Sequence, residues 1–406
     1  MKLMKVLIDW RKLLKIFNIL ISSSILASSL TLANDDILSN TKKDILNYSY
    51  EKAIEDSSKL KKDWINPITY KYIHNKSDTY TTAKSLITIS QPIFKSGGIY
   101  YAIKYANSME KYSQTSVDTQ KKELIKQVVN LLFQIKKLNI SIQKQKLLIA
   151  NAKLDIDRKK EQVLNGILDT SFLDNAIIES NIQQNNLIDL EYQKETLVNN
   201  LSNLSDKKYD ELTLPVLSMI DNTKFIDNNI YIKQAKEDID TSYWMKNMIT
   251  SNYLPTVNFT ADYTKYHETD NMTSLGGEST FKNVGFNITI PLDIKYSYNI
   301  QSYKIAYLQK KSNLDDKKKS ENSLFKNALS KISSIDKKIE ISKADVELYD
   351  SLLTQMIEQK TVGMKTDSDV QTMQNSKDIK KLDMKSLAID KQIELLEIYS
   401  RVENDA

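Results

Sequence analysis

The sequence predicts a mainly α-helical fold with a smaller β component, in which a β-hairpin followed by a long coiled-coil helical hairpin occurs twice. Pro92 precedes Gly166 by nearly the same distance as Pro291 precedes Gly363. Each proline closes a short strand-like run, and each glycine interrupts a long helical pattern. With only 7 Gly and 5 Pro in 406 residues and 27% charged side chains, the composition excludes a turn-rich all-β domain.

Residues 1–33 predict a signal peptide. Basic residues that include Lys2, Lys5 and Arg11 precede an apolar stretch that ends at Ala33. The stretch contains several serines, so a permanent membrane helix is the weaker alternative. Beyond Ala33, no segment approaches the roughly 20 apolar residues that a membrane-spanning helix needs. If the exported chain crosses a membrane, it must therefore do so with β-strands.

Four segments show the period-two alternation of amphipathic strands, near residues 66–74, 84–94, 256–267 and 280–291. In the third, for example, Val257, Phe259 and Ala261 alternate with polar residues. Each segment is about as long as a tilted transmembrane strand. A small soluble sheet with one buried face is the open alternative.

A membrane location would require several copies of the chain. Two hairpins cannot close a barrel, and lipid does not tolerate an open sheet edge. Three copies would supply twelve strands, within the range of outer-membrane barrels. The strand pattern thus predicts a trimer on the condition that the strands span a membrane.

Two long segments carry heptad repeats of apolar residues. The first repeat consists of Leu124, Val128, Leu131, Ile135, Leu138, Ile142, Gln145, Ile149, Ala152 and Ile156. The second consists of Phe325, Ala328, Ile332, Ile335, Ile339, Ser342, Val346, Tyr349, Leu353 and Met356. A helix from Gly98 to near Gly166 would be roughly 100 Å long. Because the apolar stripe is narrow, we expect a thin-walled coiled coil, with a solid coiled coil as the alternative.

Two structural repeats follow the predicted signal peptide. Residues 34–215 form the first, with a helix, two strands and a long helical hairpin whose tip lies near residue 166. Residues 216–406 form the second, with the same order of elements and a tip near residue 363.

Several functional classes have no support in the sequence. The chain has no cysteine, and its 2 histidines, His74 and His267, have no second ligand at a usable spacing, so we expect no metal site and no cofactor. We find no Gly-rich phosphate loop and no catalytic triad, so no enzyme is expected. The net charge of +5 is spread over mixed-sign helix faces, which does not indicate nucleic-acid binding.

Several short motifs resemble the TolC-like family of outer-membrane efflux and secretion channels. The segment Ser90–Phe94 with Gly97–Gly98 is similar to the family's second strand and the start of its long helix. Leu254–Pro255–Thr256 resembles its helix-to-strand junction, and the turns at 165–168 and 362–363 resemble its hairpin tips. In order and spacing, these motifs cover nearly all of the chain after residue 33.

This resemblance implies a homotrimer in which a 12-stranded β-barrel, in contact with outer-membrane lipid, is continued by a hollow α-helical tunnel in the periplasm. Such a channel is the exit duct of an efflux pump or of a type I protein secretion system. Its partners are a periplasmic adaptor (membrane fusion) protein and an inner-membrane transporter, and the cargo depends on them. A structural coiled-coil fibre or adhesin is the main alternative, and a periplasmic adaptor is the second.

The resemblance also implies two sets of functional residues at the hairpin tips. The expected adaptor contacts are Gly166, Ile167, Leu168, Gly363 and Met364. The expected periplasmic aperture comprises Asp369, Lys365 and Thr372, with Asp369 at the position of an acidic ring that favours cations. Repulsion among three copies of Asp369 would raise its pKa. Without the family, Asp369 would be interpreted as an ordinary acidic residue at a helix N-terminus.

Three positions depart from the family's pattern. A second acidic ring would fall on Thr372, so we expect a less charged gate. Lys360 replaces an aromatic residue before the second tip, and Leu292–Lys295 replaces the glycine pair at the start of the second long helix.

Overall fold

The computed structural model describes residues 35–78, 81–269 and 280–403. These residues belong to one compact unit, Asp35–Ala406. The predicted signal peptide, residues 1–33, lies outside the described residues.

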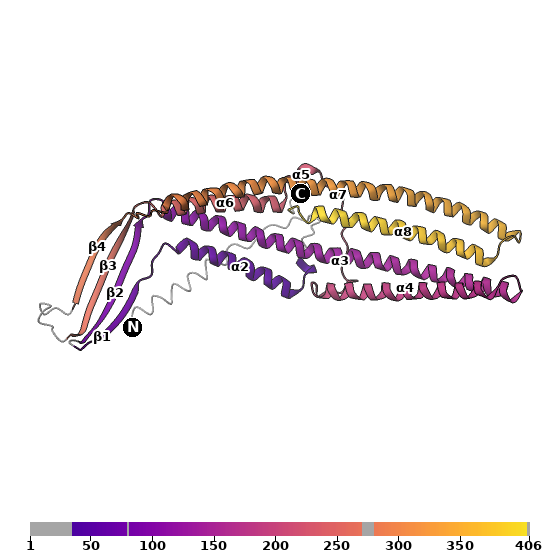
Figure 1. Ribbon diagram of the computed structural model, residues 1–406, viewed down its shortest axis with the longest axis horizontal. Coiled ribbons are helices and arrows are strands. Elements are labelled where there is room, and N and C mark those ends of the chain that lie inside the picture. The colour runs from indigo at the N-terminus through magenta and orange to yellow at the C-terminus, as the bar shows by residue number, and fades with distance from the viewer. Residues whose placement is uncertain (1–34, 79–80, 270–279, 404–406) are drawn as a thin grey trace. The chain divides into compact units, whose positions relative to one another are not determined.

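The same order of elements occurs twice along the unit, as helix, strand, strand, long helix and helix (Figure 1). The first series follows the short 3-10 helix η1 (Asp35–Ile37) and consists of α2 (Asn40–Lys62), β1 (Thr69–Lys76), β2 (Thr81–Phe94), α3 (Gly98–Leu164) and α4 (Thr170–Ser202). After the short helix α5 (Asn222–Asp227), the second consists of α6 (Ile230–Ser251), β3 (Thr256–Thr269), β4 (Thr280–Thr289), α7 (Tyr296–Thr361) and α8 (Asp367–Tyr399).

The strands form one antiparallel sheet in the order β1-β2-β3-β4. They lie at the four segments where the alternating pattern predicts them. One detail of that prediction was wrong, because Pro92 does not mark the end of a strand. It lies inside β2, opposite Asn258 and beside a register shift between Pro92 and Phe94. Such an irregularity accommodates a residue without an N–H group.

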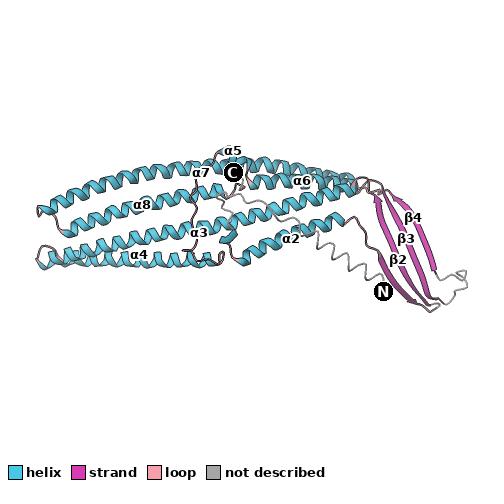
Figure 2. Ribbon diagram, turned by 180° about the vertical axis from the view of Figure 1, so that it is seen from behind, coloured by secondary structure: helices cyan, strands magenta, loops and turns pink. Residues whose placement is uncertain are grey.

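Two long helices form the framework of the helical part. α3 has 67 residues and α7 has 66, and neither contains a proline or an internal glycine. α3 contacts α2, α4, α6 and α8, whereas α7 contacts α5, α6 and α8. In both views the sheet lies at one end of these helices and the two turns lie at the other (Figure 1 and Figure 2). Within the described ranges, no helix combines the length and the apolar character needed to cross a membrane.

The buried surface of α3 is wider than the heptad predicts. Val128, Ile135, Ile142 and Ile149 are buried as expected. A second set, which the heptad misses, is also buried and comprises Ile125, Val129, Leu132 and Phe133. The narrow-stripe prediction was therefore wrong for the middle of α3, because a helix that contacts four neighbours must bury more than one face.

The two repeats differ where the second strand meets the long helix. In the first repeat, a Cβ atom at Gly98 would lie 2.6 Å from the Ser251 hydroxyl oxygen, so this close approach requires glycine. In the second, α7 begins directly after Lys295, whose backbone N–H donates to Asp293 Oδ1 at 2.7 Å. This hydrogen bond starts α7 without a glycine pair.

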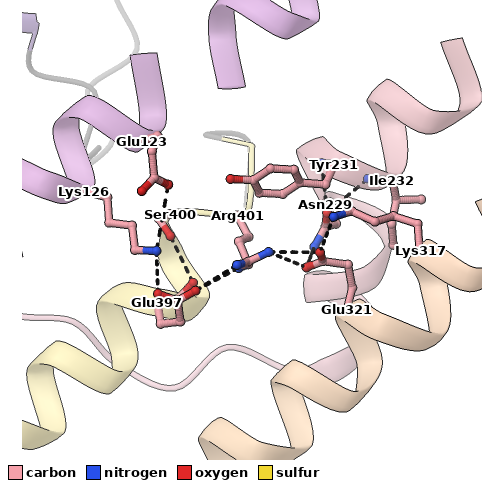
Figure 3. Close-up of polar contacts among 10 residues, drawn as sticks. All are labelled: Glu123, Lys126, Asn229, Tyr231, Ile232, Lys317, Glu321, Glu397, Ser400 and Arg401. Atoms are coloured by element: carbon pink, nitrogen blue, oxygen red, sulfur yellow. Dashed lines mark hydrogen bonds and ion pairs between the residues drawn. The ribbon is translucent and has the colours of Figure 1, made fainter. Parts of the chain in front are cut away.

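A buried ionic network joins four helices near the C-terminus (Figure 3). Glu321 on α7 is 1% exposed and accepts hydrogen bonds from Arg401 Nη1 at 3.0 and 3.1 Å. Arg401 also contacts Glu397 on α8 at 2.9 Å, and Glu397 pairs with Lys126 on α3 at 2.5 Å. Asn229, the N-cap of α6, donates to Glu321 at 3.1 Å. These contacts fix the end of α8 against α3, α6 and α7.

Candidate functional site

The register of the sheet places the apolar residues of neighbouring strands on one face. Val257 on β3 lies opposite Ile288 on β4, and Phe259 lies opposite Phe286. The ring centres of Phe259 and Phe286 are 5.6 Å apart. On the other face, Asn258 lies opposite Asn287. Because residues in direct register share a face, the sheet has an apolar side and a polar side.

The apolar side of β4 has no cover in the single chain. Phe286 is 69% exposed and Ile288 is 70% exposed. A small soluble sheet would bury this face against a helix or a second sheet, so the alternative from the sequence predicts the opposite exposure. A row of exposed large apolar residues marks a surface that contacts another protein or lipid.

The first helical turn connects α3 to α4. Gly166 has φ +69°, and the backbone N–H of Ile167 donates to Gln162 O at 2.8 Å. This is the hydrogen bond of a glycine C-cap, in which the left-handed backbone favours glycine over every other residue. Asp169 then caps α4 by accepting from the Ser171 N–H at 2.8 Å. Ile167 is 68% exposed, whereas Leu168 is only partly exposed, so the two predicted contact residues differ.

The second turn, from α7 to α8, has the same backbone geometry. Gly363 has φ +76°, and the Met364 N–H donates to Gln359 O at 2.9 Å. Met364 occupies the position in this turn that Ile167 occupies in the first, and its side chain is 76% exposed. The cap that follows is different, since Thr366 and Asp369 form a capping box. The Asp369 N–H donates to Thr366 Oγ1 at 3.2 Å, and the Thr366 N–H donates to Asp369 Oδ2 at 3.1 Å.

Within one chain, the electrostatic setting of Asp369 opposes the expected rise in its pKa. The hydrogen bonds from the backbone and side chain of Thr366 lower the pKa of Asp369, and the positive charges of Arg158 and Lys365 lower it further. Arg158, near the end of α3, lies 4.0 Å from Asp369 Oδ1. The structure therefore places Asp369 in a helix cap and next to a cation. The spacing Thr366-x-x-Asp369 is the sequence signal for this cap, which the sequence analysis missed.

The other two predicted aperture residues have different surroundings. Thr372 donates its hydroxyl to Ser368 O at 2.8 Å, within α8. Lys365 lies in the turn and acts on Asp369 through its charge. Lys360, at the end of α7, forms an ion pair with Asp367 at the start of α8. The second turn is thus stabilised by the Lys360–Asp367 ion pair as well as by the capping box.

Ion pairs attach α8 to both of its neighbours. Towards α3, α8 presents acidic side chains, in the pairs Lys137–Asp390 at 2.6 Å and Lys144–Asp383 at 2.7 Å. Towards α7, it mainly presents lysines, in the pairs Lys391–Asp336 at 2.7 Å, Lys380–Asp345 at 3.0 Å and Lys377–Asp350. This pattern of ion pairs has no local signal in the sequence, because each pair joins residues far apart in the chain.

Over the parts of the chain that the structure describes, no three His, Asp or Glu side chains are grouped so as to hold a metal ion.

Comparison with known families bears on the first half of the chain. Residues 48–205 match the family model of outer membrane efflux proteins. The resemblance to TolC-like channels that the motifs indicate is therefore confirmed. A sequence comparison with curated proteins found no match.

Solved structures share the fold over nearly the whole chain. The Campylobacter jejuni CmeC outer membrane channel is similar with a TM-score of 0.73 and 13% identity, over 95% of this chain and 92% of CmeC. The outer membrane protein VceC of Vibrio cholerae is similar with a TM-score of 0.71 and 10% identity, over 90% of this chain and 94% of VceC. The predicted fold class, mainly helical with a small antiparallel sheet, is confirmed. The family match is to residues 48–205, and the solved structures show the shared fold.

Proposed function

We propose that three copies of this chain form a channel through the outer membrane, continued by a helical tunnel in the periplasm. The observation that carries the proposal is the amphipathic sheet, whose apolar face, including Phe286 and Ile288, is left uncovered. In lipid this face would be buried by acyl chains, and the polar face with Asn258 and Asn287 would line water.

The sheet also requires partners at its edges. β1 and β4 are the outer strands of an open sheet of four. An open edge in lipid leaves backbone N–H and C=O groups without hydrogen-bond partners, at a cost of several kcal/mol each. Pairing of β4 in one copy with β1 in the next removes both edges and closes a barrel of twelve strands.

The helical turns form the periplasmic aperture in this proposal. Asp369 lies on α8 just after the second turn, with Lys365 and Thr372 nearby. The contact of Asp369 with Arg158 holds the start of α8 against α3 within each copy. We assign this contact to the closed state, and its loss to the opening of the aperture. In the trimer, three Asp369 carboxylates at the aperture would favour cations.

The exposed tips are the proposed docking surface for a periplasmic adaptor, which would connect the channel to an inner-membrane transporter. Gly166 and Gly363 shape the turns, and Ile167 and Met364 present apolar side chains to solvent, with Leu168 partly covered. In this arrangement the chain is a passive conduit and not an enzyme. Residues 1–33 would direct export, and the repeats 34–215 and 216–406 would supply equivalent parts of barrel and tunnel.

Planar-bilayer conductance tests the proposal. Purified full chain should insert and conduct ions. Phe286→Lys places a charge on the proposed lipid face. It should make the free energy of membrane insertion less favourable by about 2–4 kcal/mol. Asn287→Lys, one residue away on the polar face, should insert normally and change the conductance.

Two results would overturn the proposal. One is a wild-type protein that gives no conductance at any pH or salt concentration, as a coiled-coil fibre would. The other is equal insertion of the Phe286→Lys and Asn287→Lys proteins, because the two faces of the sheet would then be equivalent.

A further inference from the structure

Three tyrosine–lysine pairs come together at the ends of the helices that adjoin the sheet. Each pair lies on one helix, with the lysine three or four residues after the tyrosine. Lys104 Nζ lies 5.6 Å from the ring centre of Tyr100 on α3. Lys246 lies 4.8 Å from the ring of Tyr243 on α6. Lys311 lies 4.9 Å from the ring of Tyr307 on α7.

The aromatic rings connect the three pairs into one surface. Trp244 on α6 lies 6.1 Å from Tyr100 and 5.0 Å from Tyr243, measured between ring centres. Tyr243 lies 5.7 Å from Tyr307 on α7, and Lys246 also lies 5.1 Å from the Tyr307 ring. We call this surface the tyrosine–lysine belt, defined by Tyr100, Lys104, Tyr243, Trp244, Lys246, Tyr307 and Lys311. It crosses α3, α6 and α7.

The segments that carry the belt contain lysines but no acidic residue. Residues 95–109, 241–255 and 294–314 have no Asp or Glu. The chain as a whole is nearly balanced, with 57 Lys and Arg against 52 Asp and Glu, so this is a local segregation of charge. None of the three belt lysines pairs with a carboxylate of the described residues, whereas their neighbour Lys310 pairs with Asp238 at 2.7 Å.

The helices that carry the belt adjoin the sheet (Figure 1). α3 begins at Gly98, four residues after β2 ends, and α6 ends at Ser251, five residues before β3 begins. The Ser96 hydroxyl donates to Pro255 O at 2.6 Å, which joins the two connections. If the strands cross the outer membrane, Tyr100 and Lys104, within about 10 Å of the start of α3, are at the level of the lipid headgroups on the periplasmic side, and the rest of the belt continues from them onto α6 and α7.

We propose that the tyrosine–lysine belt binds the headgroups of anionic phospholipids in the periplasmic leaflet of the outer membrane. This inference rests on the proposed membrane position of the sheet. Ammonium groups match the charge of lipid phosphates, and Tyr and Trp are enriched at membrane interfaces, where their rings contact acyl chains and their polar atoms stay hydrated. The belt thereby sets how deeply the sheet sits in the bilayer.

The test uses full-length protein in non-ionic detergent, titrated with mixed micelles that contain phosphatidylglycerol or phosphatidylcholine. Bound lipid is counted by native mass spectrometry. The wild-type protein should retain phosphatidylglycerol in preference to phosphatidylcholine. The variant Lys104→Gln/Lys246→Gln/Lys311→Gln should weaken phosphatidylglycerol binding by at least about tenfold, because each lysine contributes to attraction by an anionic surface. The same positions changed to arginine should retain the preference.

A matched control removes three lysines elsewhere on the helices, in the variant Lys153→Gln/Lys194→Gln/Lys385→Gln. Lys194 also lies over a ring, 5.2 Å from the centre of Tyr209, but far along the chain from the strands. This variant should bind phosphatidylglycerol as the wild type does. If the glutamine belt variant unfolds, the three single glutamine variants replace it, and each should weaken phosphatidylglycerol binding in part. The arginine variant should still retain the preference for phosphatidylglycerol.

Three results would overturn the proposal. The first is equal phosphatidylglycerol binding by the wild type and by a folded glutamine belt variant. The second is competition by inorganic phosphate at the same concentration as lipid, which would make the belt a site for free anions. The third is an altered conductance without any change in lipid binding, which would place the belt on the wall of the channel.

The test of the lipid site can fail independently of the test of the proposed channel. A protein that conducts normally but binds lipid without the belt lysines would refute only the lipid site. A protein that never conducts, yet shows lysine-dependent binding of phosphatidylglycerol, would refute the channel and leave a lipid-binding surface.

Discussion

The two shorter helices of the hairpins, α4 and α8, follow similar turns but are held in different ways. α8 lies between α3 and α7 and forms ion pairs with both. α4 contacts α3 through apolar residues and through Gln145, which donates to Gln183 at 2.6 Å, and no ion pair joins α4 to another helix within the described ranges. Several of its apolar side chains stay exposed, such as Ile188 at 62%.

This difference indicates which hairpin can move. Ion pairs at a partly exposed surface contribute about 0.2–1 kcal/mol each and can be exchanged for water. The buried apolar residues of α8 begin at Leu382, so the part of α8 before Leu382 is held mainly by such pairs and can shift without exposing an apolar core. Moving the start of α4 would instead expose Ala176, which is buried. We therefore expect the start of α8, which carries Asp369, to be the movable element of the aperture, and α4 to be static. The following predictions test that contrast in order of decreasing effect.

The largest effect should come from Arg401→Ala, which removes the main partner of the buried Glu321. Without Arg401 the buried Glu321 keeps Lys317, at 3.2 Å, as its remaining ion-pair partner among the described residues, so the loss should cost up to about 3 kcal/mol. Amide hydrogen exchange should accelerate at the C-terminal end of α8 and stay unchanged in α4. The double variant Arg401→Met/Glu321→Gln should restore most of the protection. Equal acceleration in α4 and α8 would contradict the contrast.

A smaller effect should follow from changes at the aperture. Asp369→Ala should weaken cation selectivity and block by multivalent cations, because the acidic ring is lost. Arg158→Ala should increase the open probability, because the contact that holds α8 to α3 is removed. Asp169→Ala, at the cap of the static first turn, is the control and should leave both unchanged. Single-channel recordings in planar bilayers measure these quantities.

The pH dependence should be confined to acid conditions. The capping hydrogen bonds from Thr366 and the charge of Arg158 lower the pKa of Asp369 in the folded chain. The stabilisation is therefore fully present above the unfolded pKa of about 3.9, and it is lost as the pH falls through the lowered folded value. Open probability should stay constant from neutral pH to about pH 5 and change only below about pH 4. A midpoint near pH 6 would mean that repulsion among the three copies dominates instead.

The smallest effect should be that of salt on hydrogen exchange. Raising the salt concentration from about 0.05 M to 1 M shortens the screening length to about 3 Å and weakens exposed ion pairs. Exchange in α8 should accelerate several-fold, whereas exchange in α4 should stay the same or slow. Equal responses of the two helices would show that the ion pairs of α8 contribute nothing to its position.

The sequence predicted the parts of this fold that depend on local pattern. Alternation gave the four strands, and the glycines at 166 and 363 gave the turns, because a left-handed backbone leaves few other choices. The predictions failed where a residue's surroundings come from distant parts of the chain. Phe133 lies outside the heptad, and its burial depends on a second neighbour of α3. Glu321 and Arg401 are 80 residues apart and have no local signal.

The functional site at the second turn stays a prediction. The family resemblance singled out Asp369, but Arg158 is found only by folding α3 beside α8. The capping role of Asp369 could have been found from Thr366 alone. The proposals of an aperture, a trimer and protein partners depend on the family resemblance. The sequence of a single chain contains no other pattern from which they could be inferred.

The central claim is that the uncovered sheet closes by pairing with other copies of the chain. Its most direct test is the mass, by native mass spectrometry, of the protein extracted intact from the outer-membrane fraction. We predict three chains per particle, with Phe286→Lys reducing the amount recovered from that fraction. A single chain per particle, or recovery only from the soluble periplasmic fraction, would contradict the account.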